Sequence, residues 1–345
     1  MNVRLYNHED QGAWEAYVED AGDSNLYHLI GWKDVIEKTF GHKTYYLLAE
    51  DNDGKITGIL PLVHLRSLLF GSFIVSMPYF NYGGISAKDA KARMALLEEA
   101  IKITRATGAS HAELRHDAAL DLGLKVKTAK VSMLLDLPPL AQSLLKGFPS
   151  KLRSQIKKAE SGITRFNSGG IDELDSFYDV FSTNMRELGT PVYSKAFFRN
   201  ILERFPKRAH ICTVYVGSAP AASGFLIGFR DTLEIPWASS IRAFNGLSPN
   251  MALYWNCLRL AIEKGFSRFD FGRSTPGEGT YRFKEQWGAK PRPLYWHYWM
   301  KDGGRMPLPE LNPKNPKYRA MINIWKRLPL GLTRLIGPGI VKNLP

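Results

Sequence analysis

The sequence predicts an α/β protein (α+β in layout) built from two similar modules, each a mixed β-sheet flanked by helices. The same order of elements, namely hairpin, strand, helix and strand, occurs twice along the 345 residues. A hydrophobic content of 44% and an aromatic content of 12% are typical of a globular chain. Because the chain is longer than an ordinary domain, it has room for two full hydrophobic cores.

The first module is predicted over residues 1–137. An Asp53-Gly54 pair lies between two apolar runs, which is a strong hairpin signal. The predicted elements are the runs Tyr45–Glu50 and Ile56–Val63, an aromatic strand end at 77–84, a helix with Met94, Leu97, Ile101 and Thr104 at helical spacing, and a strand at 111–115.

The second module, predicted over residues 138–300, repeats this order. Gly265 occupies a helix C-cap position, where glycine is favoured. The predicted elements are the runs His210–Val216 and Ala221–Phe229, a strand at 233–240, a helix at 250–264 and a strand at 266–271. Four elements in the same order indicate an internal duplication.

The connector at 136–195 is predicted to be mainly helical. A helix over 151–162 would carry one polar face, formed by Lys151, Ser154 and Lys158. A solvated helix and a phosphate-binding helix are equally compatible with this pattern. Residues 301–316, rich in Pro, Gly and Asn, are expected to form a linker.

Positive charge is concentrated in two segments. The net charge is +13; residues 301–345 hold nine Lys/Arg against two acidic groups, and residues 146–165 hold six against one. Such segments attract the phosphates of nucleic acids, nucleotides or anionic lipids, although a solvated surface is the commoner explanation of any one run. We interpret 301–345 as a basic amphipathic tail that either lies on an anionic membrane or packs on the protein.

Several classes of protein are disfavoured. The two cysteines, Cys212 and Cys257, form neither a disulfide framework nor a metal-ligand motif, so no metal is expected. The N-terminus lacks the apolar run of a signal peptide, and no apolar run approaches the length of a membrane span. We therefore expect a cytoplasmic protein, with peripheral contact at the inner face of the cell membrane as a further possibility.

The strongest functional signal is the stretch 270–288. A predicted buried strand ends in Arg273-Ser274-Thr275, and a glycine-containing turn leads to the basic and aromatic segment 281–288. Strand ends that open into glycine-hinged polar loops commonly hold binding groups in α/β proteins. The alternative is a solvent-facing loop whose aromatic side chains cap the sheet. The tripeptide Asp270-Phe271-Gly272 occurs in kinases, but no other kinase motif accompanies it, so we treat it as a coincidence.

Two motifs resemble those of FemAB-type peptidyltransferases, which are duplicated GNAT-fold enzymes that add amino acids to peptidoglycan precursors. The first is Lys-x-Arg-x-x-Ile-x-x-Ala at 151–159, which is followed by Gly162 one residue earlier than in the family. The second is Tyr281-Arg282-Phe283-Lys284-x-x-Trp287-Gly288. The resemblance implies tandem GNAT-like modules, the second of them an acetyltransferase-type domain.

Three further segments are similar to the FemAB-like group associated with exosortase/PEP-CTERM and exopolysaccharide systems: 81–84, 184–195 and 235–240. The resemblance extends over 32–296. It implies transfer of an acyl or aminoacyl group to an amine of an envelope or exopolysaccharide precursor. Either aminoacyl-tRNA or acyl-CoA would be the phosphate-bearing donor.

The same resemblance implies roles for individual residues. Lys284, with Tyr281 and Arg273, would contact donor phosphate or the transition-state oxygen. The expected donor-binding residues are Arg242, Asn245, Lys151, Arg153 and Phe283. The expected acceptor-binding residues are Lys33, Tyr79, Asn81, Tyr82, Arg186, Tyr193, Trp237 and Ser239. No histidine–carboxylate pair stands out as a general base.

Two features depart from the family pattern. The connector is too short for the helical-hairpin arm of the cell-wall ligases. The loop that holds the pyrophosphate of acetyl-CoA in GNAT enzymes is also missing, because residues 242–250 contain one glycine where that loop needs several. A non-catalytic protein that binds RNA or a glycan assembly at the membrane surface is therefore kept as an alternative.

Overall fold

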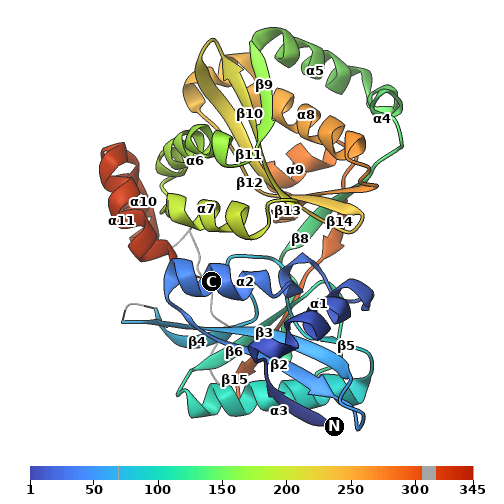
Figure 1. Cartoon of the computed structure of the whole chain (residues 1–345). Helices are drawn as coiled ribbons and strands as arrows, with labels where there is room; N and C mark the ends of the chain where they lie inside the picture. The colour runs from blue at the N-terminus through green and yellow to red at the C-terminus, as the bar shows by residue number, and fades with distance from the viewer. Residues whose placement is uncertain (69, 305–315, 345) are drawn as a thin grey trace. The chain divides into compact units, whose positions relative to one another are not determined.

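The computed structural model describes residues 1–68, 70–304 and 316–344, and in the last segment the side chains from residue 320 onward (Figure 1). Most of the linker expected at 301–316 lies outside these residues. The chain divides into two compact units. The first unit comprises the described residues of 1–131, 293–310 and 342–345, and the second comprises those of 132–292 and 311–341.

The first unit contains an eight-stranded sheet in the order β1-β2-β3-β4-β6-β15-β7, with β5 paired to β3. Neighbouring strands are antiparallel except β4 and β6, which are parallel. Its elements are β1 (Asn2–Leu5), η1 (His8–Asp10), α1 (Gln11–Asp20), η2 (Leu26–His28), α2 (Gly31–Phe40), β2 (Lys43–Glu50), β3 (Ile56–Ser67), β4 (Gly71–Val75), β5 (Ser86–Ala87), α3 (Ala90–Ala106), β6 (His111–His116), β7 (Lys125–Lys127) and β15 (Tyr295–Met300).

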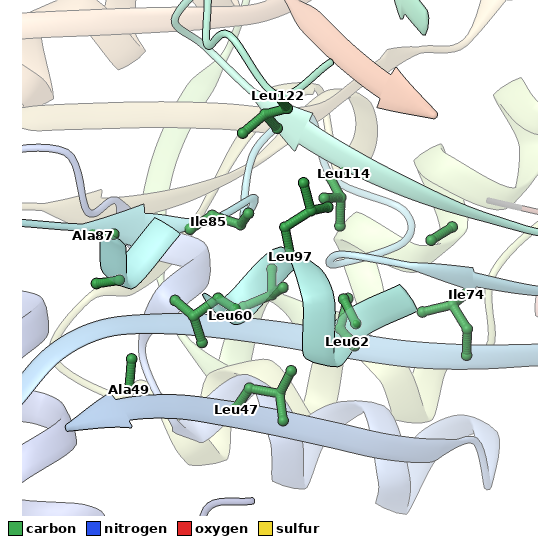
Figure 2. Close-up of a cluster of buried hydrophobic side chains, with 14 of the residues drawn as sticks. Leu47, Ala49, Leu60, Leu62, Ile74, Ile85, Ala87, Leu97, Leu114 and Leu122 are labelled. Carbon is green, nitrogen blue, oxygen red and sulfur yellow. The ribbon is translucent and has the colours of Figure 1, made fainter. Parts of the chain in front are cut away.

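The core of this unit lies between its sheet and α3 (Figure 2). Asp89 caps α3 by accepting a hydrogen bond from the Ala92 main-chain nitrogen at 2.7 Å, so the helix begins where its apolar face begins. Leu97 of that face is buried against Leu60 and Leu62 of β3. Met94, which shares the helical spacing of Leu97, is 40% exposed and lies at the margin of that face.

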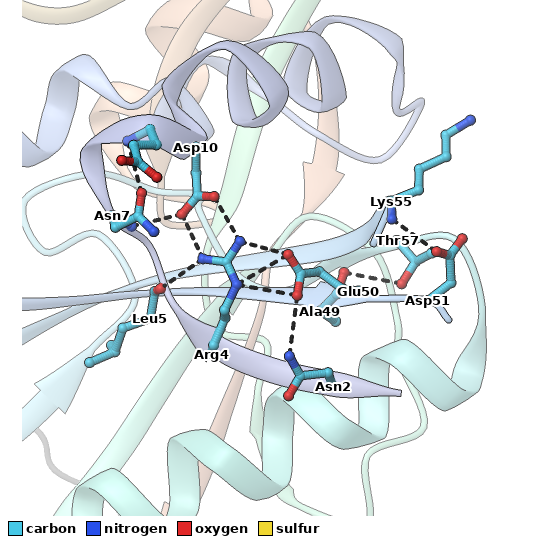
Figure 3. A network of polar contacts seen from close by, with 11 residues as sticks. Asn2, Arg4, Leu5, Asn7, Asp10, Ala49, Glu50, Asp51, Lys55 and Thr57 are labelled. Carbon is cyan, nitrogen blue, oxygen red and sulfur yellow. Dashed lines mark hydrogen bonds and ion pairs between the residues drawn. The ribbon is translucent and has the colours of Figure 1, made fainter. Parts of the chain in front are cut away.

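A polar network fixes the first strand at its outer edge (Figure 3). The Arg4 guanidinium donates to Asp10 at 2.7 Å and to Glu50 at 2.6 Å. Arg4 thereby lowers the pKa of the Asp10 carboxyl. Because both carboxylates share one cation, β1 and η1 are tied to the end of β2.

The second unit contains a seven-stranded sheet in the order β14-β8-β13-β12-β11-β10-β9. Its elements are β8 (Val131–Asp136), α4 (Ala141–Gly147), α5 (Ser150–Gly162), β9 (Arg165–Gly169), η3 (Ile171–Glu173), α6 (Leu174–Leu188), α7 (Lys195–Arg204), β10 (Ala209–Val216), β11 (Ala219–Phe229), β12 (Thr232–Ser240), η4 (Arg242–Leu247), α8 (Pro249–Glu263), β13 (Arg268–Ser274), α9 (Gly279–Glu285), β14 (Lys290–Pro293), α10 (Pro316–Arg327) and α11 (Leu330–Val341).

The predicted duplication is confirmed by sheet order. Strands β1, β2, β3, β4 and β6 correspond in sequence and in pairing to β9, β10, β11, β12 and β13, and the pairs β4–β6 and β12–β13 are both parallel. The sequence pattern did not indicate where the later strands would pair. Strand β8 joins the second sheet beside β13, whereas β15 joins the first sheet beside β6. Strand β8 follows the strands of the first sheet in sequence but belongs to the second sheet, and β15 follows the strands of the second sheet but belongs to the first.

One local prediction was wrong. The stretch 77–84, expected as an aromatic strand end, is a loop after β4 in which Met77 and Tyr79 have φ of 52° and 74°. These left-handed conformations cannot continue a strand.

The connector is mainly helical, as predicted, because it holds α4, α5 and α6. It also contains the strand β9, which pairs with β10.

Candidate active site at the end of β13

The parallel pair β12 and β13 separates partway along its length. Its register runs from Thr232 opposite Arg268 to Glu234 opposite Asp270 and then stops. Both strands nevertheless continue, β12 to Ser240 and β13 to Ser274. Strand ends released from their ladder expose main-chain polar groups to other partners, and in α/β sheets ligands commonly bind at such ends.

A buried carboxylate fixes the point of separation. Asp270 is 3% exposed and accepts hydrogen bonds from the Ser132 hydroxyl at 2.6 Å and from the Gly272 main-chain nitrogen at 2.7 Å. Gly272 has φ of 75°, a conformation that side chains disfavour, which explains the glycine after Phe271. The Asp-Phe-Gly tripeptide therefore has a local structural role at the end of β13, and its occurrence in kinases remains a coincidence.

Lys284 reaches this point from α9. Its Nζ donates to the carbonyl oxygens of Gly272 at 3.0 Å and Arg273 at 2.9 Å, and the residue is 8% exposed. Burial lowers the pKa of Lys284 from 10.5 to about 8, although the neighbouring Asp270 carboxylate opposes the shift. Lys284 is thus a buried lysine with a pKa of about 8, so the ammonium form still predominates at neutral pH.

Aromatic packing holds α9 in place. Trp287, just after the helix, is fully buried, and its ring centroid lies 5.6 Å from that of Phe148. Phe283 packs edge-on against Tyr254 at 5.1 Å, and Tyr254 stacks on Phe271 of β13 at 5.4 Å. Phe283, predicted to bind the donor, therefore belongs to the packing beneath α9. Such packing positions Lys284 as a rigid group rather than a mobile surface lysine.

Other polar groups lie along the separated strand ends. Ser239 of β12 and Ser274 of β13 are 3% and 4% exposed, and within the described residues neither hydroxyl has a hydrogen-bond partner. Buried hydroxyls are normally satisfied, so these two are available to a ligand or water. Arg273 is exposed and Tyr281 is half-buried. Lys284, Arg273 and Tyr281, predicted as a catalytic group, are therefore carried by β13 and the adjoining α9.

The segment between β12 and α8 does not form the usual pyrophosphate loop. Residues 242–247 make the 3₁₀ helix η4, and Pro249, which has no N–H, is the first residue of α8. The main-chain nitrogen of Met251 is engaged by the carbonyl of Ser248 at 2.9 Å. The first turn of α8 therefore offers few amide donors to an anion.

Predicted donor residues around η4 and α5 lie at the surface of the second unit. The Arg242 side chain is 58% exposed and its Nε lies 3.9 Å from a Glu187 carboxylate oxygen. Asn245 is exposed, as is Lys151 of α5. The Arg153 guanidinium donates to the Phe148 carbonyl at 2.7 Å, so this local hydrogen bond explains its position without a donor ligand.

Three predicted acceptor residues lie around α6 and β12. Trp237 and Tyr193 belong to an aromatic cluster with Phe197, Phe198 and Phe225, so packing alone explains their positions. Arg186 has a buried Nε with no partner within the described residues. A buried guanidinium nitrogen without a partner is costly, so Arg186 remains the member of this group best suited to bind a ligand.

The remaining predicted acceptor residues are in the first unit. Lys33 is paired with Glu37 at 2.8 Å. The Tyr79 hydroxyl donates to the Lys342 carbonyl at 2.6 Å, and the Asn81 carbonyl accepts from Trp296 at 3.3 Å. Tyr82 is buried. Within the first unit, these four residues lie on α2 and in the loop after β4.

Sequence reasoning missed the residue that holds this loop. Arg115 is 1% exposed, donates to the Phe80 carbonyl at 2.5 Å and to Glu113 at 2.6 Å, and places its guanidinium 4.3 Å from the ring of Trp296. The sequence signal available was the charged pair Glu113 and Arg115 at the end of a buried strand. The contact of Arg115 with Trp296 could not be predicted, because the two residues are distant in sequence. Within the described part of the chain, no group of three or more metal-ligating side chains is present.

Residues 147–285 match the family model described as "Acetyltransferase (GNAT) domain". A comparison with curated proteins gave no match.

Solved structures share the fold at low sequence identity. FemX has a TM-score of 0.67 and 15% identity, over 86% of this chain and 97% of its own. A tandem GNAT protein from the clavulanic acid biosynthesis pathway has a TM-score of 0.57 and 12% sequence identity, and the match covers 86% of this chain and 98% of that protein. The C-terminal domain of a putative lysylphosphatidylglycerol synthetase from Agrobacterium fabrum has a TM-score of 0.56 and 12% sequence identity, and the match covers 86% of this chain and 93% of that domain. Residues 147–285 therefore match a GNAT acetyltransferase domain, and the chain shares its fold with solved tandem GNAT-like structures.

Proposed function

We propose that the protein transfers an acyl or aminoacyl group to an amine of a cell-envelope or exopolysaccharide precursor. The observation that carries the proposal is Lys284, a buried ammonium fixed at the separated end of β13 inside the GNAT domain. In acyl transfer the carbonyl oxygen gains negative charge, and a preorganised cation beside it lowers the barrier. The acceptor named here rests on the motif resemblance at 81–84, 184–195 and 235–240.

The reaction is a simple displacement. The acceptor amine attacks the carbonyl carbon of the donor ester or thioester, forming a C–N bond. The carbon–oxygen or carbon–sulfur bond then breaks, and the proton lost by the amine ends on the leaving hydroxyl or thiol. Lys284 would contact the developing oxyanion or a donor phosphate, with Arg273 as a second cation beside the strand end. The acceptor amine would lose its proton to water or to substrate phosphate.

We propose aminoacyl-tRNA as the preferred donor, with acyl-CoA as the second candidate. The first turn of α8 begins with Pro249, and η4 replaces a glycine-rich loop, so the usual pyrophosphate cradle of acetyl-CoA has few donors here. On α5, Lys151, Lys157 and Lys158 are exposed and suit a polyanion. The likeness to FemX and to a putative lysylphosphatidylglycerol synthetase also favours aminoacyl transfer at an envelope component.

Mass spectrometry after incubation with amine-bearing envelope extracts tests the proposal. One reaction receives a labelled mixture of aminoacyl-tRNAs and a parallel one receives acetyl-CoA. We expect new amide products with the first donor and few or none with the second. Salt-sensitive RNA binding without any product, with either donor, would instead favour the non-catalytic binding protein.

A further inference from the structure

Helices α10 and α11 present large apolar side chains to solvent. Both helices pack on α6. The exposed fractions are 63% for Met321, 63% for Ile324, 40% for Leu332, 77% for Leu335 and 39% for Ile336. A surface helix normally turns its apolar side inward, so this arrangement indicates a partner.

The opposite sides of these helices explain how they are held. Arg334 donates to the Ser182 hydroxyl at 2.9 Å and to Asp179 at 2.7 Å, both on α6. Gly337 approaches the main chain of Val192 so closely that a Cβ there would lie 2.9 Å from its nitrogen. Trp325 of α10 is 9% exposed. The two helices are thus anchored on the second unit through one side, and their exposed apolar side chains do not serve that packing.

Charge identifies the partner. Residues 311–345 contain seven Lys/Arg and no acidic residue, and Lys326 and Arg327 are exposed beside the apolar side chains. A second copy of this chain would bring the same positive charge to the contact and be repelled. An anionic lipid surface offers an apolar interior and negative headgroups together, and so complements both features.

We propose that Met321, Ile324, Leu332, Leu335 and Ile336, the tail face, dock the protein on an anionic bilayer. The apolar side chains would enter between the headgroups, and Lys326 and Arg327 would lie at the lipid phosphates. The inference deepens the proposed function, since an envelope precursor is found at a membrane, but binding to lipid needs neither donor nor acceptor.

Vesicle sedimentation of the full chain tests the tail face. We expect binding to vesicles of equal parts phosphatidylglycerol and phosphatidylcholine, and little binding to phosphatidylcholine alone. Leu335→Asp should weaken the partition coefficient at least about tenfold, because it replaces an inserted apolar group with a charge repelled by the lipids. Substituting Gln at both Lys326 and Arg327 should weaken it about thirtyfold on the anionic vesicles.

Leu140→Asp is the matched control, because Leu140 lies in the same unit and is 65% exposed but outside the tail face. It should bind as the original chain does. Equal binding by Leu335→Asp and the original chain would overturn the proposal. A failure of the original chain to bind anionic vesicles would also overturn it. In that case, a dimer seen by light scattering that Leu335→Asp dissociates would show that the tail face binds a second copy instead. Transfer to a water-soluble amine, measured without vesicles, reports separately on the proposed function, since Leu335→Asp should leave it unchanged.

Discussion

Lys284 donates a hydrogen bond to the main-chain carbonyl of Gly272 at 3.0 Å, where β13 has lost its pairing with β12. A second N–H of the same ammonium is used by the Arg273 carbonyl at 2.9 Å. A protonated lysine has three N–H groups, so one remains for a ligand. A neutral lysine has only two N–H groups, and both are used by the carbonyls of Gly272 and Arg273. The charge state of Lys284 therefore decides whether it can serve a substrate.

Activity should fall as Lys284 loses its proton. Burial favours the neutral amine in the folded protein and lowers the pKa to about 8, so the cation is lost as the pH rises through that value. We expect kcat/KM for the donor, which reports on the free enzyme, to decline above about pH 8. The profile is measured with a donor that does not titrate in this range. A rate that rises through the same range and levels off would instead make the neutral amine a general base.

Asp270→Asn should move this decline to lower pH. The Asp270 carboxylate raises the pKa of Lys284, and an amide keeps the acceptor oxygen for Ser132 and Gly272 without the charge. The folded protein would then lose the lysine proton more easily. The comparison of the two pH profiles measures this shift, and an unchanged midpoint would remove Asp270 from the electrostatics of the site.

Gly84→Ala should destabilise the first unit by about 2–4 kcal/mol. A Cβ at this position would lie 2.4 Å from the imidazole of His116, which is itself buried. Urea unfolding gives the free energy. Gly12→Ala is the control, because nothing lies within 4 Å of a Cβ there and alanine is the better helix former. Equal stability of the two variants would show that His116 can move aside.

Acid should destabilise the same unit through a buried histidine pair. The Ile85 main-chain N–H donates to His116 Nε2 at 2.9 Å, so the His116 proton lies on Nδ1, which meets His297 Nδ1 at 3.0 Å. Burial lowers the pKa of both rings. The unfolded state therefore takes up protons first, and the free energy of unfolding should fall as the pH drops below about 6.5.

Urea unfolding at a series of pH values measures this loss. A free energy of unfolding that stays constant down to about pH 5 would contradict the neutral histidine pair.

Local patterns predicted the repeated elements well, because each is encoded within a few neighbouring residues. The hairpin at Asp53-Gly54 and the helix that ends before Gly265 are examples, and both form as expected. The partner strands of β8 and β15 were not predicted, since pairing between segments distant in sequence leaves no periodic signal in either one.

The site was predicted only in part, because some of its features are encoded locally and others depend on residues distant in sequence. Lys284 belongs to a local motif and could be selected from it, whereas its burial depends on Phe148 and Tyr254, which are distant in sequence. The structural role of Asp270 was not predicted, because it depends on Ser132, which lies 138 residues away. Trp237 was chosen because it belongs to the segment 235–240 that resembles the FemAB-like group, and its place in the phenylalanine cluster became evident only from the packing.

Turnover of a Lys284→Met variant tests the central claim most directly. Methionine fills much the same space without the charge, but the Gly272 and Arg273 carbonyls lose their donor, so we expect a loss of stability of about 1–3 kcal/mol in a protein that still folds. We predict a loss of about a hundredfold to a thousandfold in kcat/KM, with unfolding that remains cooperative, whereas Lys290→Met at an exposed position should keep full turnover. Unchanged turnover in a folded Lys284→Met protein would contradict the role of Lys284 in acyl transfer.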